Sequence, residues 1–274
     1  MSGAQYFSDA FAINALMDSS VEINLASAVS EHQAIKSALE ASGVEVVVVE
    51  APAGCQDGVY TANWGLCRGD RCVLSSLPNK RKGEEPYAEA VLARLGKKTI
   101  KPPVRFSGQG DTLPCGDLLF CGGGYRTDPA VHRFLKEELG YEIISLHTLP
   151  ELDEHGQPVI NSVTGWPDSF FYDLDLALAV ITPGLIAWCP EAFDSASQDK
   201  LAALPLEKIT VSYDEARTGF ACNLVSTGET IVMSKHAPAF KDELVRRGFK
   251  IITQEGVELS KGGGFIRCIT LTLD

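Results

Sequence analysis

Apolar and polar residues along the chain follow a pattern that recurs about every fifty residues. Apolar residues at helical spacing predict five helices, each followed by a short β-rich run that is typical of a strand. The predicted helices cover residues 30–41, 85–95, 128–139, 191–204 and 236–247, and the strands cover 46–49, 99–100, 141–146, 208–212 and 249–253. Ser30 at a helix start, and Gly43, Gly140 and Gly248 just after helix ends, agree with these boundaries.

Each helix except the first follows two apolar runs joined by turn residues, which predicts a β-hairpin. The hairpins pair residues 59–66 with 72–75, 111–113 with 118–121, 171–180 with 185–189, and 222–226 with 231–233. Residues 263–273 would close the fifth unit together with the N-terminal residues 12–14. We therefore predict an α/β fold of five β-β-α-β units, arranged as a five-bladed pseudo-symmetric propeller in a single domain of residues 1–274. The polar insertion 151–161 is expected to be a surface loop or a lid.

The amino-acid composition says little about the fold, but the net charge limits which partners the protein can bind. The chain has 274 residues, of which 45% are hydrophobic and 22% charged, as in ordinary globular proteins. A net charge of −12 argues against a nucleic-acid or anionic-membrane partner but suits a small cationic substrate. The N-terminus lacks the basic and apolar parts of a secretory signal, and no apolar run reaches the ~20 residues of a membrane span. We expect a cytoplasmic protein and leave open whether it forms a homo-oligomer.

The cysteines and glycines do not indicate a bound metal or cofactor. Eight cysteines at irregular spacings are expected to be reduced thiols, and the absence of a C-x2-C pair argues against a structural zinc site. The Gly-rich stretches lack the strand–G-x-G-x-x-G–helix context of a dinucleotide site. We therefore expect no cofactor.

Polar residues recur at the starts of the predicted hairpins, where a buried strand would otherwise be apolar. They lie in residues 57–63, 106–111, 171–175, 222–223 and 267–268, and in a ring they would face one cleft. Cys268 follows three consecutive glycines and adjoins Arg267. A nearby cation favours the thiolate, so Cys268 is a candidate nucleophile. The alternative is that Cys268 is a small buried apolar residue at a strand start.

These motifs together resemble the guanidine-group-modifying superfamily with the pentein fold, which includes dimethylarginine dimethylaminohydrolases, arginine deiminases, arginine dihydrolases and amidinotransferases. The resemblance covers nearly the whole chain. It rests on Asp57-Gly-Val-Tyr-Thr-Ala-Asn63, Phe106-Ser-Gly-Gln-Gly-Asp111, the Gly-Gly-Gly-Tyr-Arg-Thr-Asp run at 122–128, Asp173-Leu-Asp175 and residues 262–268. The first motif is most similar to the branch that contains arginine dihydrolases and the bacterial proteins generally called amidinotransferases.

The resemblance implies a role for each matching residue. Cys268 would attack the guanidinium carbon and form a covalent S-alkylthiouronium intermediate. The remaining matches are substrate-binding residues: Asp175 and Asn63 for the guanidinium, Asp57 for the amino-acid end, Arg126 for the α-carboxylate with Arg81 as its helper, and Asp111 in the second motif. The substrate would be a small cationic guanidino compound. Taken singly, Arg126 and Asn63 could be turn residues. Asp173 and Asp175, which alternate along a predicted strand, could be charges on the edge of a sheet.

Two positions depart from the family pattern. Asp173 stands where the family has its catalytic histidine, and Ser107 stands where it has the glutamate that orients the histidine. Asp173 could move protons only if burial or Asp175 raised its pKa, and a carboxylate near Cys268 would disfavour the thiolate. The sequence therefore leaves two hypotheses. The first is a hydrolase or amidinotransferase that uses Asp173 as an altered acid–base group, and the second is a catalytically silent pentein that binds an arginine-like ligand or a protein partner.

Overall fold

The computed structural model describes residues 1–18 and 20–274, and within them four three-stranded sheets repeat one topology. In each sheet the first two strands form an antiparallel hairpin, and the third strand pairs in parallel with the second. The strands are β1 (Gly65–Arg68), β2 (Arg71–Leu74), β3 (Lys98–Ile100), β4 (Thr112–Cys115), β5 (Leu118–Cys121), β6 (Glu142–Ser145), β7 (Leu178–Thr182), β8 (Leu185–Trp188), β9 (Glu207–Thr210), β10 (Val225–Ser226), β11 (Thr230–Ser234) and β12 (Lys250–Gln254). The predicted α/β class with repeated β-β-α-β units is confirmed.

A helix connects the second strand of each sheet to the third, as the parallel pairing requires. The α-helices are α1 (Leu25–Ala41), α2 (Glu84–Arg94), α3 (Val131–Leu139), α4 (Ser195–Ala203), α5 (Tyr213–Arg217) and α6 (Pro238–Arg246). The sequence places the first helix start too late, because the N-cap is Asn24, whose Oδ1 accepts a hydrogen bond from the Ser27 amide at 3.0 Å. It also places the fourth start too early, since Asp194 caps α4, and it does not predict α5.

The fifth unit differs from the prediction because it contains α1 but no sheet. Residues 46–49 and 269–273 are not strands, and residues 12–14 do not pair with the C-terminal segment as strands. A single parallel bridge joins Ser2 to Val49, extended by a hydrogen bond from the Gly3 amide to the Val49 carbonyl at 3.2 Å. The alternation of Ile269, Leu271 and Leu273 therefore reports burial against neighbouring side chains and not strand pairing.

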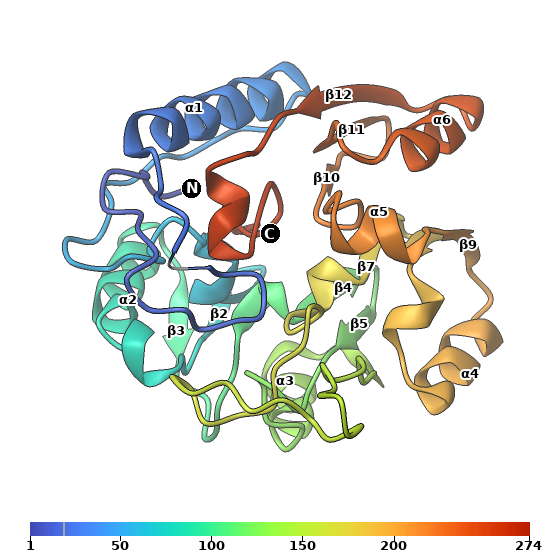
Figure 1. The fold of residues 1–274 in the computed structure, drawn as a ribbon, viewed down its shortest axis with the longest axis horizontal. Coiled ribbons are helices and arrows are strands. Elements are labelled where there is room, and N and C mark those ends of the chain that lie inside the picture. The colour runs from blue at the N-terminus through green and yellow to red at the C-terminus, as the bar shows by residue number, and fades with distance from the viewer. Residues whose placement is uncertain (19) are drawn as a thin grey trace.

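The units surround a middle region that the C-terminal segment enters. Figure 1 shows the helices α1, α2, α3, α4 and α6 on the outside, strands such as β4, β7 and β10 nearer the middle, and the C-terminus near the middle of the view. The central strands are the most buried, because they pair on both edges and the helices cover them. All four residues of β8, for example, are buried.

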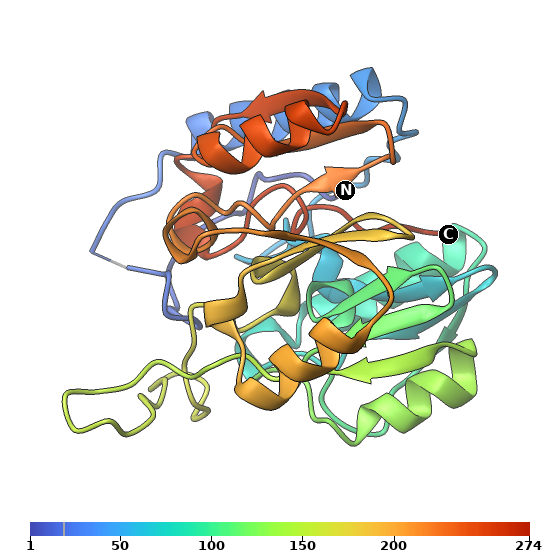
Figure 2. The same ribbon diagram turned by 90° about the vertical axis from the view of Figure 1, so that its right-hand side faces the viewer.

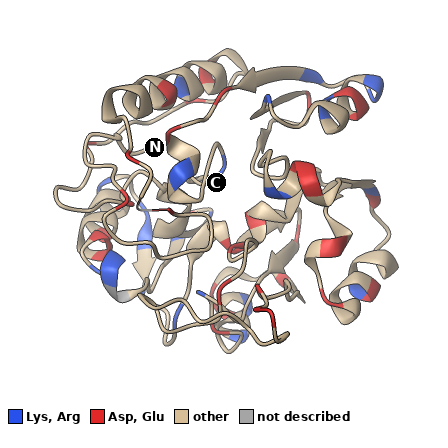
Figure 3. Ribbon diagram, in the orientation of Figure 1, with Lys and Arg blue, Asp and Glu red and all other residues tan. Residues whose placement is uncertain are grey.

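The insertion lies away from this body. Residues 149–168 carry two isolated bridges, Leu152 with Pro158 and Ile160 with Pro167, and extend on the side opposite the C-terminus (Figure 2). Their exposure agrees with a surface loop. None of the helices in residues 1–18 and 20–274 has the length and hydropathy needed to cross a bilayer. Acidic and basic residues are interspersed on the outer helices (Figure 3), where pairs such as Lys36 with Glu40 form.

Candidate active site

Polar side chains from five separate segments meet at one end of the inner strands. Four segments directly precede the first strand of a sheet: η1 (Thr61–Trp64), η3 (Gly108–Gly110), η4 (Leu174–Leu176) and the residues before β10. The fifth is the turn that follows η6 (Leu259–Gly262) and leads to Cys268. Hydrogen bonds join side chains of these segments across sequence separations of up to 158 residues. The predicted convergence of the hairpin starts is therefore present.

The Cys268 thiol is buried between an amide and a carboxylate. Its Sγ lies 3.3 Å from Asp175 Oδ2, to which the thiol donates, and it accepts a hydrogen bond from Asn223 Nδ2 at 3.1 Å. Asn223 Oδ1 accepts hydrogen bonds from the backbone amides of Phe265 and Arg267 at 3.1 and 3.0 Å, so the same side chain fixes the turn. Gly264 allows this close packing, because a Cβ there would lie 2.9 Å from Sγ.

The site does not hold the thiol as a thiolate. Burial, followed by the carboxylates of Asp175 and Asp173, raises the pKa of Cys268 well above its usual range. The Arg267 guanidinium does not offset these effects, since it donates to Gln109 Oε1 at 2.9 Å and to the Thr270 carbonyl at 3.0 Å. The attraction between the Arg267 guanidinium and a Cys268 thiolate, expected from the sequence, is present, but burial and the two carboxylates outweigh it.

Asp175 is the carboxylate in direct contact with the thiol. It is fully buried, and among the described residues its Oδ1 has no hydrogen-bond partner. Burial and the nearby charge of Asp173 raise the pKa of Asp175 to about 8, against the attraction of the Arg267 guanidinium. A carboxyl group with this pKa exchanges its proton near neutral pH.

Asp173 has a different environment, because donors surround its carboxylate. Oδ1 accepts a hydrogen bond from Ser107 Oγ at 2.8 Å, and Oδ2 accepts one from Asn63 Nδ2 at 2.8 Å. The Arg126 guanidinium adds an ion pair at 3.4 Å to Oδ2. Ser107 thus contacts residue 173 directly, as the glutamate and histidine of the family pattern would be expected to do, but with a hydroxyl and a carboxylate.

A buried ion pair lies behind this cluster. Arg81 donates from Nε and Nη2 to the two oxygens of Glu84, both at 2.7 Å, and both side chains are 1% exposed. Its Nη1 donates to Asn63 Oδ1 at 2.8 Å. Because an arginine can only donate, Asn63 must turn its oxygen to Arg81 and its Nδ2 to Asp173. Arg81 therefore fixes the orientation of Asn63.

The other predicted binding residues line the same region. The Arg126 guanidinium lies 4.0 Å over the Tyr172 ring, whose hydroxyl donates to the Gly263 carbonyl at 2.6 Å. Burial raises the pKa of Asp57 to about 6, and its carbonyl accepts from Arg81 at 3.1 Å. Asp111 is buried, which raises its pKa well above the usual range, and its Oδ1 accepts the Leu174 amide at 3.1 Å.

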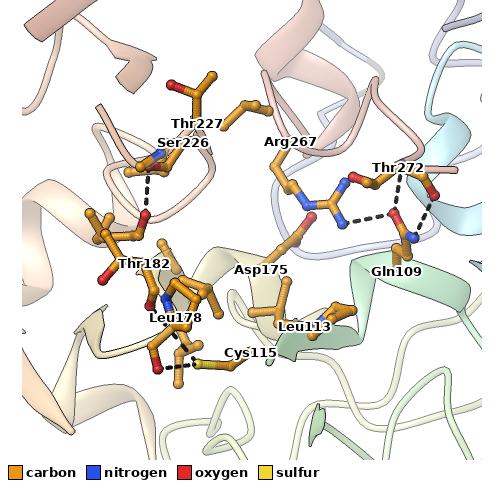
Figure 4. A pocket seen from close by; sticks show the side chains of 18 of the residues that line it. Gln109, Leu113, Cys115, Asp175, Leu178, Thr182, Ser226, Thr227, Arg267 and Thr272 are labelled. Atoms are coloured by element: carbon orange, nitrogen blue, oxygen red, sulfur yellow. Dashed lines mark hydrogen bonds between the residues drawn. The ribbon is translucent and has the colours of Figure 1, made fainter. Parts of the chain in front are cut away.

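A pocket of about 340 Å³ reaches this site from the side of the hairpin turns. Its walls include Leu113 of β4, Leu178 of β7 and Thr227, and both Asp175 and Arg267 line it. Figure 4 shows the side chains of Asp175 and Arg267 close together, with Gln109 hydrogen-bonded to the guanidinium. Among residues 1–18 and 20–274, no group of three or more His, Cys, Asp or Glu side chains is arranged to hold a metal ion.

Sequence reasoning missed three residues that shape the site. Glu84 lies three positions after Arg81, a spacing at which opposite charges meet on a helical turn, so its pairing could have been predicted. Asn223 stands in a recognised polar segment, but nothing in its local sequence indicates that it reaches Cys268. The contact of Tyr172 with Arg126 likewise depends on tertiary structure.

The sequence of the chain matches one known protein family over almost its whole length. The sequence profile described as "N,N dimethylarginine dimethylhydrolase, eukaryotic" matches residues 6–273. The N(G),N(G)-dimethylarginine dimethylaminohydrolase of Mycobacterium tuberculosis is 31% identical over 274 residues, which cover 100% of this chain and 84% of that protein. The chain therefore belongs to the dimethylarginine dimethylaminohydrolase family, within the pentein superfamily that the sequence resemblance indicates.

Other relatives are arginine dihydrolases. The bifunctional arginine dihydrolase/ornithine cyclodeaminase AgrE of Nostoc is 31% identical over 251 residues, which cover 89% of this chain and 33% of AgrE. The chain thus spans about a third of that relative. The product-bound N-terminal domain of the arginine dihydrolase ArgZ superposes with a TM-score of 0.89 at 28% identity, covering 100% of this chain and 96% of that domain. A Pseudomonas aeruginosa structure of the family, at 18% identity and a TM-score of 0.74 over 96% of this chain and 92% of that one, supports the fold alone.

Proposed function

We propose that the protein hydrolyses a C–N bond in the guanidinium group of arginine or a relative, through a covalent intermediate on Cys268. The observation that carries this proposal is the contact of the buried Cys268 thiol with Asp175, beside a second carboxylate at Asp173. A guanidinium is a planar cation whose N–H groups match carboxylate oxygens. A bound cation would also stabilise the thiolate that the free site disfavours.

The names of the relatives favour hydrolysis over amidino transfer. One relative is named a dimethylarginine dimethylaminohydrolase and another an arginine dihydrolase. Arginine and its methylated forms are therefore the first substrates to test. Transfer would need an incoming amine in place of water, and none of the contacts described above selects one.

The family resemblance supplies the remaining roles. The thiolate of Cys268 attacks the guanidinium carbon and gives an S-alkylthiouronium, which water then hydrolyses. Asp175 holds guanidinium nitrogens, Arg126 pairs with the α-carboxylate, and Asp57 and Asp111 contribute to binding. Arg126 can bind a carboxylate because Tyr172 supports its guanidinium from one side.

Asn63 and Arg81 are better placed to support the site than to contact substrate. Arg81 already makes two hydrogen bonds to Glu84 and one to Asn63, all of 2.8 Å or less. To bind a substrate carboxylate, Arg81 would have to leave Glu84 buried without its partner, which is costly. We therefore propose that the pair fixes Asn63, and through it Asp173.

A direct test is to incubate the protein with arginine, methylated arginines, agmatine and guanidinoacetate, quench in acid, and record intact mass with ammonia, methylamines, citrulline and ornithine. A covalent adduct and product should form in the wild type and be lost in Cys268→Ser. The matched control is Cys55→Ser, because Cys55 is partly exposed and lies outside the contacts of the thiol. The Cys55→Ser variant should still form both the covalent adduct and the product.

The other outcomes identify the alternatives. Saturable binding by calorimetry without adduct or product would support a catalytically silent protein. The absence of binding, adduct and product for every compound would show that the substrate class is wrong. Product formation that persists in Cys268→Ser would exclude the covalent mechanism.

A further inference from the structure

Hydrolysis of a guanidinium through a thiol needs a group that takes the thiol proton and gives a proton to the leaving amine. The family pattern assigns this role to the residue at position 173. We propose instead that Asp175 transfers the proton in this protein, and that Asp173, which Ser107, Asn63 and Arg126 hold in place, anchors the substrate cation. This inference rests on the proposed function and specifies which carboxylate acts as its acid and base.

Asp175 has the geometry for this role. One carboxylate oxygen, Oδ2, lies 3.3 Å from the Cys268 sulfur and accepts the thiol proton. The other, Oδ1, is buried and has no partner among the described residues, so it is available to a second proton donor or acceptor. The two oxygens can therefore serve the thiol and the leaving nitrogen at the same time.

Asp173 lacks these features. Its two oxygens accept hydrogen bonds from Ser107, Asn63 and Arg126, and no hydrogen bond joins it to Cys268 in the described part of the chain. These donors occupy both oxygens of Asp173, whereas Oδ2 of Asp175 already contacts the thiol. Arg81 and Glu84 hold Asn63 in the orientation that presents a donor to Asp173.

The proton movements balance with Asp175 alone. The Cys268 proton passes to the Asp175 carboxylate as sulfur bonds to the guanidinium carbon. The C–N bond then breaks, and Asp175 gives this proton to the leaving nitrogen, so a neutral amine departs and a cationic thiouronium remains. Water gives one proton to Asp175 as its oxygen bonds to carbon, and the C–S bond breaks. Of the two protons from water, one ends on the Cys268 sulfur, and Asp175 releases the other to solvent, where the departed amine takes it up, so the products are a urea-type compound and an ammonium ion.

The charged surroundings of Asp175 are consistent with this cycle. The titratable groups that face it are Asp111, Tyr172, Asp173, Cys222, Arg267 and Cys268. Burial has the largest effect and raises the pKa of Asp175, the nearby Asp173 raises it further, and the Arg267 guanidinium lowers it. Asp175 is among the residues that line the pocket on the hairpin side (Figure 4), so this is the side from which water would have to approach the buried carboxylate.

The test compares Asp175→Asn and Asp173→Asn on two cations of similar shape. Arginine must lose an amine, which needs a proton, whereas its S-methyl isothiouronium analogue loses a thiol that departs with much less need of one. Rates of adduct formation on Cys268 are measured by quenched mass spectrometry. Asp242→Asn, which removes an exposed carboxylate on α6, is the matched control. Alkylation of Cys268 by iodoacetamide shows that each variant still presents the thiol.

We expect Asp175→Asn to slow the arginine reaction by about 100-fold or more, the scale of a lost general acid, and the isothiouronium reaction by less than about 10-fold. Asp173→Asn should weaken both reactions by a similar factor, through KM. Equal losses on the two cations in Asp175→Asn, or a loss selective for arginine in Asp173→Asn, would overturn the assignment. If the wild type forms no adduct with either cation, the proposed function itself fails, and the role of Asp175 fails with it.

Discussion

The buried pair of Arg81 and Glu84 gives the sharpest test of how the site is supported. Glu84→Gln keeps the shape of the side chain but removes the carboxylate that is hydrogen-bonded to the buried Arg81 guanidinium. Both side chains are 1% exposed, so water cannot replace the lost carboxylate. Breaking a buried pair by removing one partner costs about 3–5 kcal/mol of unfolding free energy, and we expect a loss in that range.

The neighbouring residue provides a matched control. Glu85 pairs with Lys82 at 2.8 Å, but its side chain is 31% exposed. Exposed pairs contribute about 0–1 kcal/mol, so Glu85→Gln should change the unfolding free energy by less than about 1 kcal/mol. The two substitutions are chemically identical and one position apart, which isolates the effect of burial.

The measurement is urea unfolding followed by tryptophan fluorescence, because Trp64 donates from its indole nitrogen to Glu84 Oε2 at 3.3 Å. The slope of unfolding free energy against urea should stay constant, so that the midpoint shift reports stability. The double variant Arg81→Met/Glu84→Leu should recover part of the loss, since the Asn63 oxygen and the Trp64 indole nitrogen stay unpaired. A loss in Glu84→Gln no larger than in Glu85→Gln would refute the reasoning.

Three further predictions concern the site itself. Gly264→Ala should abolish adduct formation, since the new Cβ would lie 2.7 Å from the Cβ of the reactive cysteine, whereas Gly184→Ala meets nothing within 4 Å and should be neutral in the same mass assay. The pKa of Asp175 is about 8 in the folded protein and about 3.9 in the unfolded chain. Its contribution to the free energy of unfolding should therefore fall as the pH rises from about 4 to about 8. Urea titrations at several pH values should show a flatter pH dependence of stability in Asp175→Asn than in the wild type. Asp173→His alone should not give citrulline or ornithine at the rate of the double variant Ser107→Glu/Asp173→His, because serine cannot orient the imidazole as a carboxylate does.

The repeating fold could be predicted because its signals are local. Apolar spacing, turn residues and helix-ending glycines such as Gly140, which has φ of 71°, each act over a few residues. The absence of a sheet from the fifth unit of the described chain could not be predicted. The alternation in residues 269–273 shows which side chains are buried but not which backbone groups pair. The sequence likewise predicts a strand over residues 171–177, although Leu174–Leu176 form a 3-10 helix that contains Asp175 and directly follows Asp173.

The sequence predicts which residues come close together at the candidate site, but not the contacts that they make there. Family motifs indicate which residues converge, and the hydrogen bond from Cys268 to Asp175 and the ion pair of Arg126 with Asp173 show that they do. Whether Asn63 offers its oxygen or its amide nitrogen to Asp173 depends on Arg81, which lies 18 positions away and reaches it only in the folded chain. Such orientations are set by tertiary packing, and for this reason the sequence could not assign the proton-transfer residue.

The two departures from the family pattern form one coherent change. A glutamate at position 107 beside Asp173 would place two carboxylates in contact, and one of them would have to take up a proton. Serine removes that conflict, because its hydroxyl donates to Asp173 at 2.8 Å while Asn63 and Arg126 contact the other oxygen. A site that had merely lost its function would be expected to leave buried polar groups unpaired at such positions. The unpaired oxygen belongs instead to Asp175, beside the thiol, which is where the proposed chemistry needs an available acceptor.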